Sequence, residues 1–415
     1  MSAKVSVRKF TPLEYSSAIA LAAFILFLAA CSSAPHPQQS TPLTQPAQSS
    51  MSLTVEDLDY QQIIAAADIY LTQEPLTITT YPPPADGGGI HEYYSQAPYF
   101  WPNPKDPNGP YIRRDGYNNP NVFTAHFKVM NEMSVAVSTL TAAYIITHNP
   151  QYADKAIAWM RAWFIDPATQ MAPNLQYAQV IKGVSEGRGT GIIDTHMLVK
   201  VARSAEILEQ DDVLTGPDKT GVNKWFSEYL HWLTTSPHGK DEMNAKNNHG
   251  TFWLMQAAEF SRLVGDQTTF AFCQERFMKV LLPDQMAANG SFPLELARTK
   301  PFGYSLFNLN AMCVDCWILS TPGKNLFNYT TPNGRNMRLG LTFLYPYLVD
   351  QSKWPYKHDV EHWGAHSGRE DCLLLGGLAY GIPEYVEFWK TGQPVSTNKT
   401  PWCDGIIGPT ILWVH

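Results

Sequence analysis

The chain has 415 residues, of which only 16% are charged, and 30 basic against 37 acidic side chains give a formal net charge of −7. An apolar fraction of 44% is enough to build a buried core, which excludes an intrinsically disordered chain. No basic run that could follow a nucleic-acid backbone is present, so we expect no nucleic-acid partner.

Residues 1–31 have the features of an export signal. Three basic residues among the first nine precede an apolar run over 18–30, which is too short to span a bilayer comfortably. The run ends in Leu28-Ala29-Ala30-Cys31, which resembles a bacterial lipoprotein signal and implies lipidation of Cys31. We therefore expect an outer-membrane lipoprotein of a Gram-negative bacterium, in the periplasm or at the cell surface. Ordinary secretion with cleavage near the same place is the alternative.

Residues 32–51 are rich in Ser, Pro, Gln and Thr and carry almost no large apolar side chain. Such a segment cannot bury enough surface to offset the entropy of ordering, so it is predicted to be a flexible linker. Residues 52–415 then form a single folded domain.

Most of that domain is predicted to be helical, because apolar residues recur at helical spacing. The predicted helices are 125–146, 152–164, 190–208, 224–233, 249–263, 267–282, 306–319, 335–348 and 371–380. Strand-like alternation is sparse, and only 405–414 is predicted to be extended. Successive helical hairpins of this length can close into an (α/α) toroid, whose loops gather at one end to form a cleft. A plain helical bundle and an irregular solenoid are the alternatives.

Residues 81–120 are dense in Pro, Gly, Asn and Tyr and predict a long ordered loop, which in a compact domain is often functional. Two aromatic and two basic side chains in it suit an acidic sugar, and we expect them to bind substrate: Tyr99, Trp101, Arg113 and Arg114. The alternative is a loop that only packs over the helices.

Four residues in two segments carry the chemistry. Breaking a 4-linked uronic acid by elimination requires stabilisation of charge on the carboxylate, removal of the C5 proton and protonation of O4. The Asn248 amide and the Arg298 guanidinium can hold the carboxylate. Tyr304 can move both protons if Arg298 and His249 lower its pKa, and His249 can orient Tyr304 or assist with the proton.

Each of these residues also has a purely structural interpretation. Asn248 could cap the helix that follows it, and His249 could be a hydrogen-bonded structural histidine. Arg298 could form a surface ion pair, and Tyr304 could be a packed ring. The hypothesis depends on the combination.

Asn247-Asn248-His249 followed by an aromatic residue, and then Arg298-Thr-Lys-Pro-Phe-Gly-Tyr304, resemble the alginate lyase superfamily domain, and most closely its branch of bacterial glucuronan lyases. The loop from Tyr99 to Gly116 is similar to that domain's N-terminal signature. The resemblance implies an incomplete (α/α) toroid with this loop over the cleft. It also implies that Asn248 and Arg298 neutralise the substrate carboxylate, while His249 and Tyr304 transfer protons.

Four further side chains are predicted to contact substrate. Arg188 is a candidate subsite cation, and the resemblance puts His196 and the neighbouring Asp194 near the cleft. Asn247 and Trp253 belong to the same stretch as Asn248.

The sequence therefore predicts a polysaccharide lyase, needing no cofactor, that cleaves an anionic β-1,4-linked polyuronate, either alginate or glucuronan. A glycoside hydrolase is the first alternative and needs two opposed carboxylic acids, for which Glu186, Asp194 and Glu295 are candidates. A non-catalytic uronate-binding lipoprotein is the second. His358, Glu361, His362 and His366 have helical spacing, but we expect a histidine-rich helix face there and no metal.

Overall fold

The apolar spacing of the sequence produces a structure made almost entirely of helices. The computed structural model describes residues 53–54, 58–84, 87–364, 368–392 and 405–414, which all lie within one compact unit, Pro42–His415. The predicted signal with Cys31, the predicted linker and His366 lie outside the described residues.

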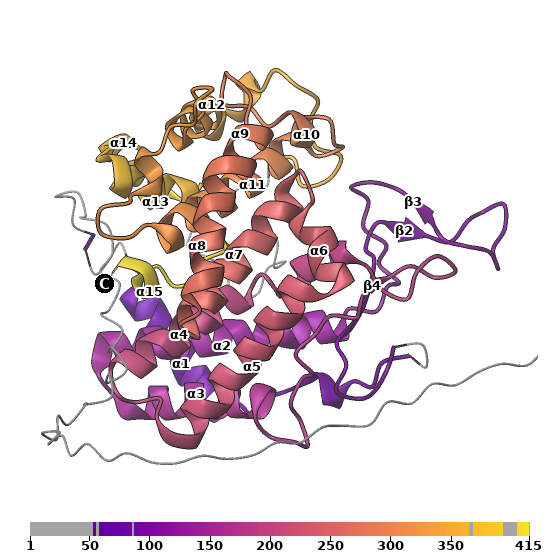
Figure 1. Ribbon diagram of the computed structural model, residues 1–415, viewed down its shortest axis with the longest axis vertical. Coiled ribbons are helices and arrows are strands. Elements are labelled where there is room, and N and C mark those ends of the chain that lie inside the picture. Colours follow the sequence, from indigo (N-terminus) through magenta and orange to yellow (C-terminus); the bar gives the residue numbers. More distant parts are fainter. Residues whose placement is uncertain (1–52, 55–57, 85–86, 365–367, 393–404, 415) are drawn as a thin grey trace, which may run out of the picture. The chain divides into compact units, whose positions relative to one another are not determined.

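Helices alternate between an inner and an outer layer (Figure 1). The inner helices are mostly buried, and each packs on the next: α2 (Ala125–Thr147), α4 (Leu198–Gln210), α7 (Asn248–Leu263), α11 (Pro301–Leu319) and α13 (Asp371–Tyr380). Each is followed by an outer helix that packs on it: α3 (Pro150–Phe164), α5 (Gly216–Thr235), α8 (Gln267–Arg276), α12 (Met337–Val349) and α14 (Pro383–Thr391). The predicted incomplete (α/α) toroid is confirmed.

Short elements complete the ring. Helix α1 (Tyr60–Thr72) packs on α2, and the one-turn or two-turn helices α6 (Pro237–Met243), α9 (Leu282–Gln285) and α10 (Pro293–Leu296) lie in the connections. The segment 405–414 was predicted to be extended, and this is wrong at its end. Helix α15 (Ile411–Val414) packs there on α2 and α4, and its apolar side chains are buried.

Other differences concern the helix ends. The predicted helix 190–208 begins as a 3-10 segment, Gly189–Thr195, and α4 follows it. The predicted helix 267–282 changes to a π-helical turn at Phe277–Leu281. Propensity and periodicity are weak guides to where a helix begins, because capping and packing decide it.

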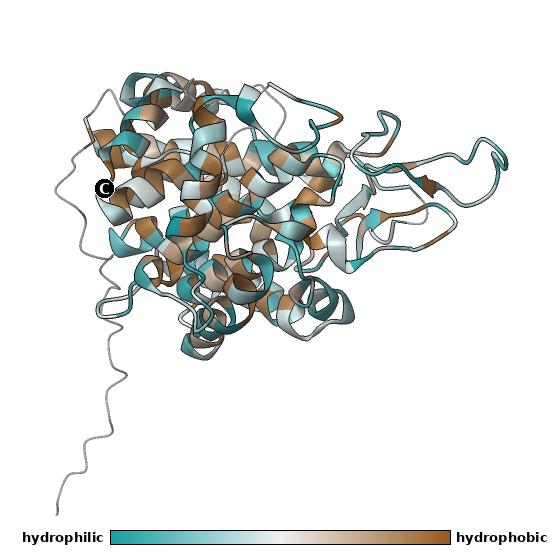
Figure 2. Ribbon diagram, turned by 90° about the horizontal axis from the view of Figure 1, so that it is seen from above, coloured by the Kyte–Doolittle hydropathy of each residue, from teal (hydrophilic) through white to brown (hydrophobic). Residues whose placement is uncertain are grey.

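The predicted loop over 81–120 is mostly irregular and carries three of the four short strands (Figure 1). Strand β1 (Tyr94–Gln96) pairs in parallel with β4 (Tyr177–Val180), and β2 (Phe100–Trp101) pairs antiparallel with β3 (Ile112–Arg113). Figure 2 shows that this projecting loop is largely hydrophilic, whereas hydrophobic residues concentrate on the helices.

Helix α2 is the one described helix that is long and apolar enough to cross a membrane. In its most apolar window 67% of the residues are buried inside the protein, as expected for the core helix of a toroid.

Candidate active site

Three of the four predicted catalytic residues come from two neighbouring inner helices, and the fourth precedes one of them. Asn248 and His249 open α7, and Tyr304 lies in the first turn of α11, which packs along α7. Arg298 lies between α10 and α11, and its guanidinium carbon is 4.2 Å from the centre of the Tyr304 ring. The structure therefore brings two segments that are fifty residues apart in sequence to one place.

Glu295, at the end of α10, holds Asn248. Its carboxylate accepts the Asn248 backbone N–H at 2.7 Å and the Asn248 side-chain amide at 2.8 Å. The carboxylate also lies at the N-terminus of α7, where unpaired N–H groups favour an anion. The expectation that Asn248 itself caps the helix is therefore wrong, because Asn247 occupies the cap position and Asn248 is the first helical residue.

His249 is held by a second buried carboxylate. The Nδ1 atom of His249 lies 2.7 Å from a carboxylate oxygen of Glu242, a residue of α6 that is only 1% exposed. The His249 side chain itself is 19% exposed, so part of the ring remains accessible.

Arg298 is held by a carboxylate of the projecting loop. Its Nε and one Nη donate to the two Asp115 oxygens at 3.0 and 2.8 Å, and the Thr299 hydroxyl donates to the same carboxylate at 2.9 Å. Although burial alone would raise the pKa of Asp115, hydrogen bonds and charge from Arg298 hold it well below its usual range. Arg298 is thus a half-buried, loop-anchoring residue as well as a candidate substrate ligand.

Tyr304 is protonated in this state. Its hydroxyl donates to the Tyr99 hydroxyl at 2.7 Å. Burial, and then the neighbouring Tyr99, raise the pKa of Tyr304 well above its ordinary value, and the opposing effect of Arg298 is smaller. The prediction that cationic neighbours make this phenol unusually acidic is therefore wrong, because the burial of the hydroxyl outweighs a single nearby guanidinium.

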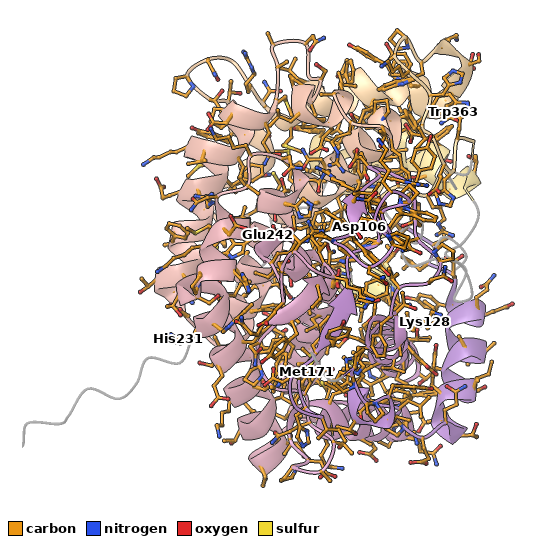
Figure 3. The ribbon with its side chains drawn as sticks, turned by 90° about the vertical axis from the view of Figure 1, so that its right-hand side faces the viewer. Asp106, Lys128, Met171, His231, Glu242 and Trp363 are labelled. Atoms are coloured by element: carbon orange, nitrogen blue, oxygen red, sulfur yellow. The ribbon has the colours of Figure 1, made fainter. Side chains whose placement is uncertain are left out.

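Electrostatic coupling shows that these groups share one site. Both Arg298 and His249 lower the pKa of Glu295, which burial raises. Glu242, whose pKa burial also raises, is affected by His249 and by Arg188. Figure 3 looks at the side toward which the β2–β3 loop projects, and Glu242 is seen near its centre.

Of the arginines predicted to bind sugar, two lie against aromatic rings and one pairs with a carboxylate. Arg114 lies 5.0 Å from the Trp101 ring, and both side chains are at least partly exposed. The Arg188 guanidinium lies 5.3 Å from the Phe100 ring and donates to Gln179 at 2.5 Å, while Arg113 donates to Asp115 at 2.6 Å. Contact of these residues with a sugar stays a prediction.

Three predicted substrate ligands behave differently from these. Trp253 is fully buried and its indole donates to the Leu233 carbonyl at 3.0 Å, so the prediction that it binds substrate is wrong. Trp253 lies on the face of α7 that packs against the outer helices α5 and α8, where it contacts Leu233 and Phe272.

His196 is 5% exposed and packs edge-on against Phe252, one helical turn beyond Asn248. It lies beneath the site and also borders a separate cavity of about 140 Å³. Burial lowers its pKa to about 4, so it is neutral. Asn247 is half-buried, and its carbonyl accepts from Gln285. Sugar contact of either residue stays a prediction.

The carboxylates required by a hydrolase have other partners. Asp194 is buried and accepts hydrogen bonds from Tyr93, Ser95 and Gln179. Glu295 is bonded to Asn248, and Glu186 is exposed. Two of the three candidates are therefore committed to holding the structure.

The histidine cluster after α12 is not helical. His358 stacks on Trp363 with ring centres 4.1 Å apart, Glu361 accepts from Lys300 and Asn118, and His362 has a left-handed backbone with φ of 64°. The helical interpretation of this spacing is wrong for His358, Glu361 and His362. Among the described residues, no group of three His, Cys, Asp or Glu side chains could hold a metal.

Three carboxylates complete the site: Glu242, Glu295 and Asp115. The sequence had named Glu295 only as a candidate acid of a hydrolase, and had given no role to Glu242 or Asp115. Asp115 directly follows Arg113 and Arg114 in the sequence, and this position could have been used to predict that it lies near the site. Glu242 carries no recognisable motif.

Known proteins resemble this chain in both sequence and fold. The sequence model of the family described as alginate lyase matches residues 77–354. The structure is similar to that of an alginate lyase from Bacteroides ovatus, with 32% sequence identity, a TM-score of 0.76, and coverage of 86% of this chain and 93% of that one.

The fold is also similar to that of alginate lyase A1-III from Sphingomonas species A1, with 15% identity, a TM-score of 0.52, and coverage of 86% and 96%. A form of that enzyme complexed with a tetrasaccharide gives 15% identity, a TM-score of 0.55, and coverage of 86% and 95%. A search of curated proteins gave no match.

Proposed function

Because the chain belongs to the alginate lyase family, we propose that it cleaves a β-1,4-linked polyuronate by β-elimination and leaves an unsaturated non-reducing end. The observation that carries the proposal is the convergence of Asn248, His249, Arg298 and Tyr304 on the first turns of α7 and α11. We propose alginate, in its mannuronate-rich parts, as the first substrate, because the relative at 32% identity is an alginate lyase. Glucuronan is the second.

Asn248 and Arg298 hold the uronate carboxylate in this proposal. Glu295 accepts one amide hydrogen of Asn248, and the amide group has a second hydrogen to donate. Asp115 takes the Nε edge of Arg298, and the remaining N–H groups of the guanidinium are on the opposite edge. Both donors can therefore bind a second carboxylate without releasing the first, and they stabilise the charge that develops when the C5 proton leaves.

Tyr304 supplies the acid. Since its pKa is raised, the phenol carries its proton at neutral pH and can deliver it to O4 as the C4–O4 bond breaks. We assign the C5 proton to His249. The electron pair of the broken C5–H bond forms the C4=C5 double bond, and the C4–O4 pair leaves on O4, which takes the proton of Tyr304. Proton transfer from His249 to Tyr304 through solvent then restores both groups.

The projecting loop supplies subsites. Trp101 offers an aromatic face for sugar C–H groups, and Arg113, Arg114 and Arg188 offer positive charge to neighbouring carboxylates, with Tyr99 closest to Tyr304. Alginate and glucuronan differ at C2, remote from the reacting bond, so these contacts are expected to determine the preference.

The test is to incubate the protein with polymannuronate, polyguluronate and glucuronan, and to record the ultraviolet absorbance of the unsaturated product. We expect Tyr304→Phe to lower kcat by ~10²–10⁴-fold, the usual contribution of a general acid, while the dissociation constant for oligouronate stays unchanged. Tyr60→Phe, on α1, removes a hydroxyl outside the site and is expected to leave kcat unchanged.

Three results contradict this assignment. No absorbance increase with any polyuronate rules out a lyase of this kind. New reducing ends without absorbance indicate a hydrolase. Sugar binding with no cleavage by the unaltered protein indicates a binding lipoprotein.

We also propose that the chain is exported and anchored to the outer membrane through lipidated Cys31. The support is the apolar run and the Leu-Ala-Ala-Cys sequence alone. Incorporation of labelled palmitate that disappears in Cys31→Ala is the check.

A further inference from the structure

Glu242 is a buried carboxylate that no part of the proposed reaction uses directly. It lies on α6, a helix of seven residues, and is 1% exposed. Its carboxylate touches the Nδ1 atom of His249 at 2.7 Å, seven residues further along the chain. The question is what this contact does to His249.

The backbone that carries Glu242 is held firmly. Ser236 caps α6 by accepting the Gly239 N–H at 2.9 Å. A Cβ on Gly239 would lie 2.0 Å from the Leu233 carbonyl oxygen, so only glycine lets α6 approach the end of α5 this closely. Helix α6 also packs directly on α7. The position of the carboxylate relative to His249 is therefore determined by packed backbone on both sides.

The burial of Glu242 has an energetic cost. Burial raises its pKa, whereas the charge of His249 and their hydrogen bond lower it, and Arg188 acts in the same direction. Carboxylates are almost never buried without a partner, and an apolar side chain of the same size would pack at no such cost. The residue that Glu242 supports in return is His249.

An ionised carboxylate offers only acceptors, so the Nδ1 atom of His249 donates to Glu242 when Glu242 carries its charge. In a neutral imidazole the proton is then fixed on Nδ1, and Nε2 is left with its lone pair. A His249 that donated from Nε2 could not accept a proton there. The partner at Nδ1 thus decides which His249 tautomer meets the substrate.

We infer that Glu242 is a positioning residue that fixes the Nδ1–H tautomer of His249, so that Nε2 is the atom that accepts the C5 proton. This inference rests on the proposed elimination for the identity of the proton, but the tautomer itself is a property of the free protein. Glu242 does not touch the sugar in this scheme.

The tautomer is measured first, by nitrogen NMR of the full chain labelled in histidine, with His249→Gln identifying the His249 signals. The two ring nitrogens of a neutral imidazole have well-separated shifts. We expect Nδ1 of His249 to carry the proton in the unaltered protein. A proton on Nε2 overturns the inference, whatever the activity.

The second measurement is the effect of Glu242→Gln, which keeps the shape but can either accept from or donate to Nδ1. We expect a mixture of His249 tautomers and a fall in kcat of ~10–100-fold, as is usual for partners that orient a functional histidine, with KM nearly unchanged. Asp241→Asn removes the neighbouring, exposed carboxylate and is the matched control, with both quantities expected to stay as in the unaltered protein.

Each outcome has one meaning. Unchanged kcat and an unchanged tautomer in Glu242→Gln contradict the role of Glu242. A variant that does not fold leaves the tautomer of the unaltered protein as the deciding result. If the unaltered protein cleaves no polyuronate, the proposed function fails, and the tautomer still tests the structural part.

Discussion

At the scale of single residues, the carboxyl groups of the site differ from one buried carboxyl group elsewhere among the described residues. Glu242, Glu295 and Asp115 each accept hydrogen bonds from a residue of the site. Asp315 differs from them because it is fully buried within α11 and both of its oxygens lack a hydrogen-bond partner. Burial raises its pKa well above the usual value, so the side chain is a neutral acid in the folded protein.

Asp315 therefore makes stability depend on pH. The pKa of Asp315 is higher in the folded than in the unfolded protein. Below the unfolded-state pKa of about 3.9 the carboxyl group is neutral in both states, so its burial then costs no ionisation free energy. Above that pH the unfolded state ionises first, and folding stability falls by up to about 1.4 kcal/mol per pH unit. We expect Asp315→Asn to gain stability relative to the unaltered protein as the pH rises above about 4, as measured by urea midpoints.

The matched change Asp154→Asn alters an exposed carboxyl on α3. It should show no such trend. A constant difference between Asp315→Asn and the unaltered protein across this pH range would contradict the account.

At the scale of elements, the β2–β3 loop depends on contacts with other parts of the chain. It is joined to the rest of the domain by hydrogen bonds of Asp115 with Arg298 and Thr299, of Tyr99 with Tyr304, and of Asn118 with Glu361. Because the pKa of Asp115 is held low, its ion pair with Arg298 is present at neutral pH and is lost only on strong acidification. The loop that carries the predicted subsites is therefore fastened to the proposed catalytic residues themselves.

Removing this charge should loosen the loop. A half-exposed pair of this kind contributes about 1 kcal/mol at most, which corresponds to about fivefold more opening. We expect Asp115→Asn to be cut by trypsin after the exposed Arg113 and Arg114 about fivefold faster than the unaltered protein at neutral pH.

Asp106→Asn is the control, since Asp106 is an exposed acid of the same loop (Figure 3). Equal cleavage of Asp115→Asn and the unaltered protein would show that the other contacts are enough to hold the loop.

At the scale of the whole described unit, the last described helix, α15, packs on inner helices from much earlier in the chain. Trp413 on α15 is fully buried, its indole donates to Ile407 at 2.8 Å, and its carbonyl accepts from Trp317 on α11. The Asp371 carboxylate accepts the Ile406 N–H and fixes the approach to α15. The four residues of α15 thereby contact helices α2, α4 and α11, which are distant from one another in sequence.

We expect Trp413→Ala to lower the free energy of unfolding by ~3–5 kcal/mol, the usual cost of a tryptophan-sized cavity in a core. The measurement is the urea unfolding midpoint. Trp101→Ala, in the projecting loop, should leave that midpoint unchanged, and a similar shift in both variants would contradict the closing role of α15.

The sequence by itself determined most of the helices, and it led to four candidate site residues that the structure brings together. Helical periodicity is a local property, so the inner helices could be predicted from it. Asn248, His249, Arg298 and Tyr304 could be identified because elimination needs those groups and because they occur in two short segments. The ends of helices were less predictable, and α15 was missed because four residues carry too little periodicity.

Only the tertiary structure decided how those residues are held and in what protonation state. The partners of Asn248 and Arg298 lie 47 and 183 residues away, distances at which sequence spacing carries no information about contact. Whether Trp253 faces sugar or core, and whether Tyr304 is more or less acidic, depends on how much surrounding protein excludes water. That exclusion arises from all the packed helices together, so no single segment contains it.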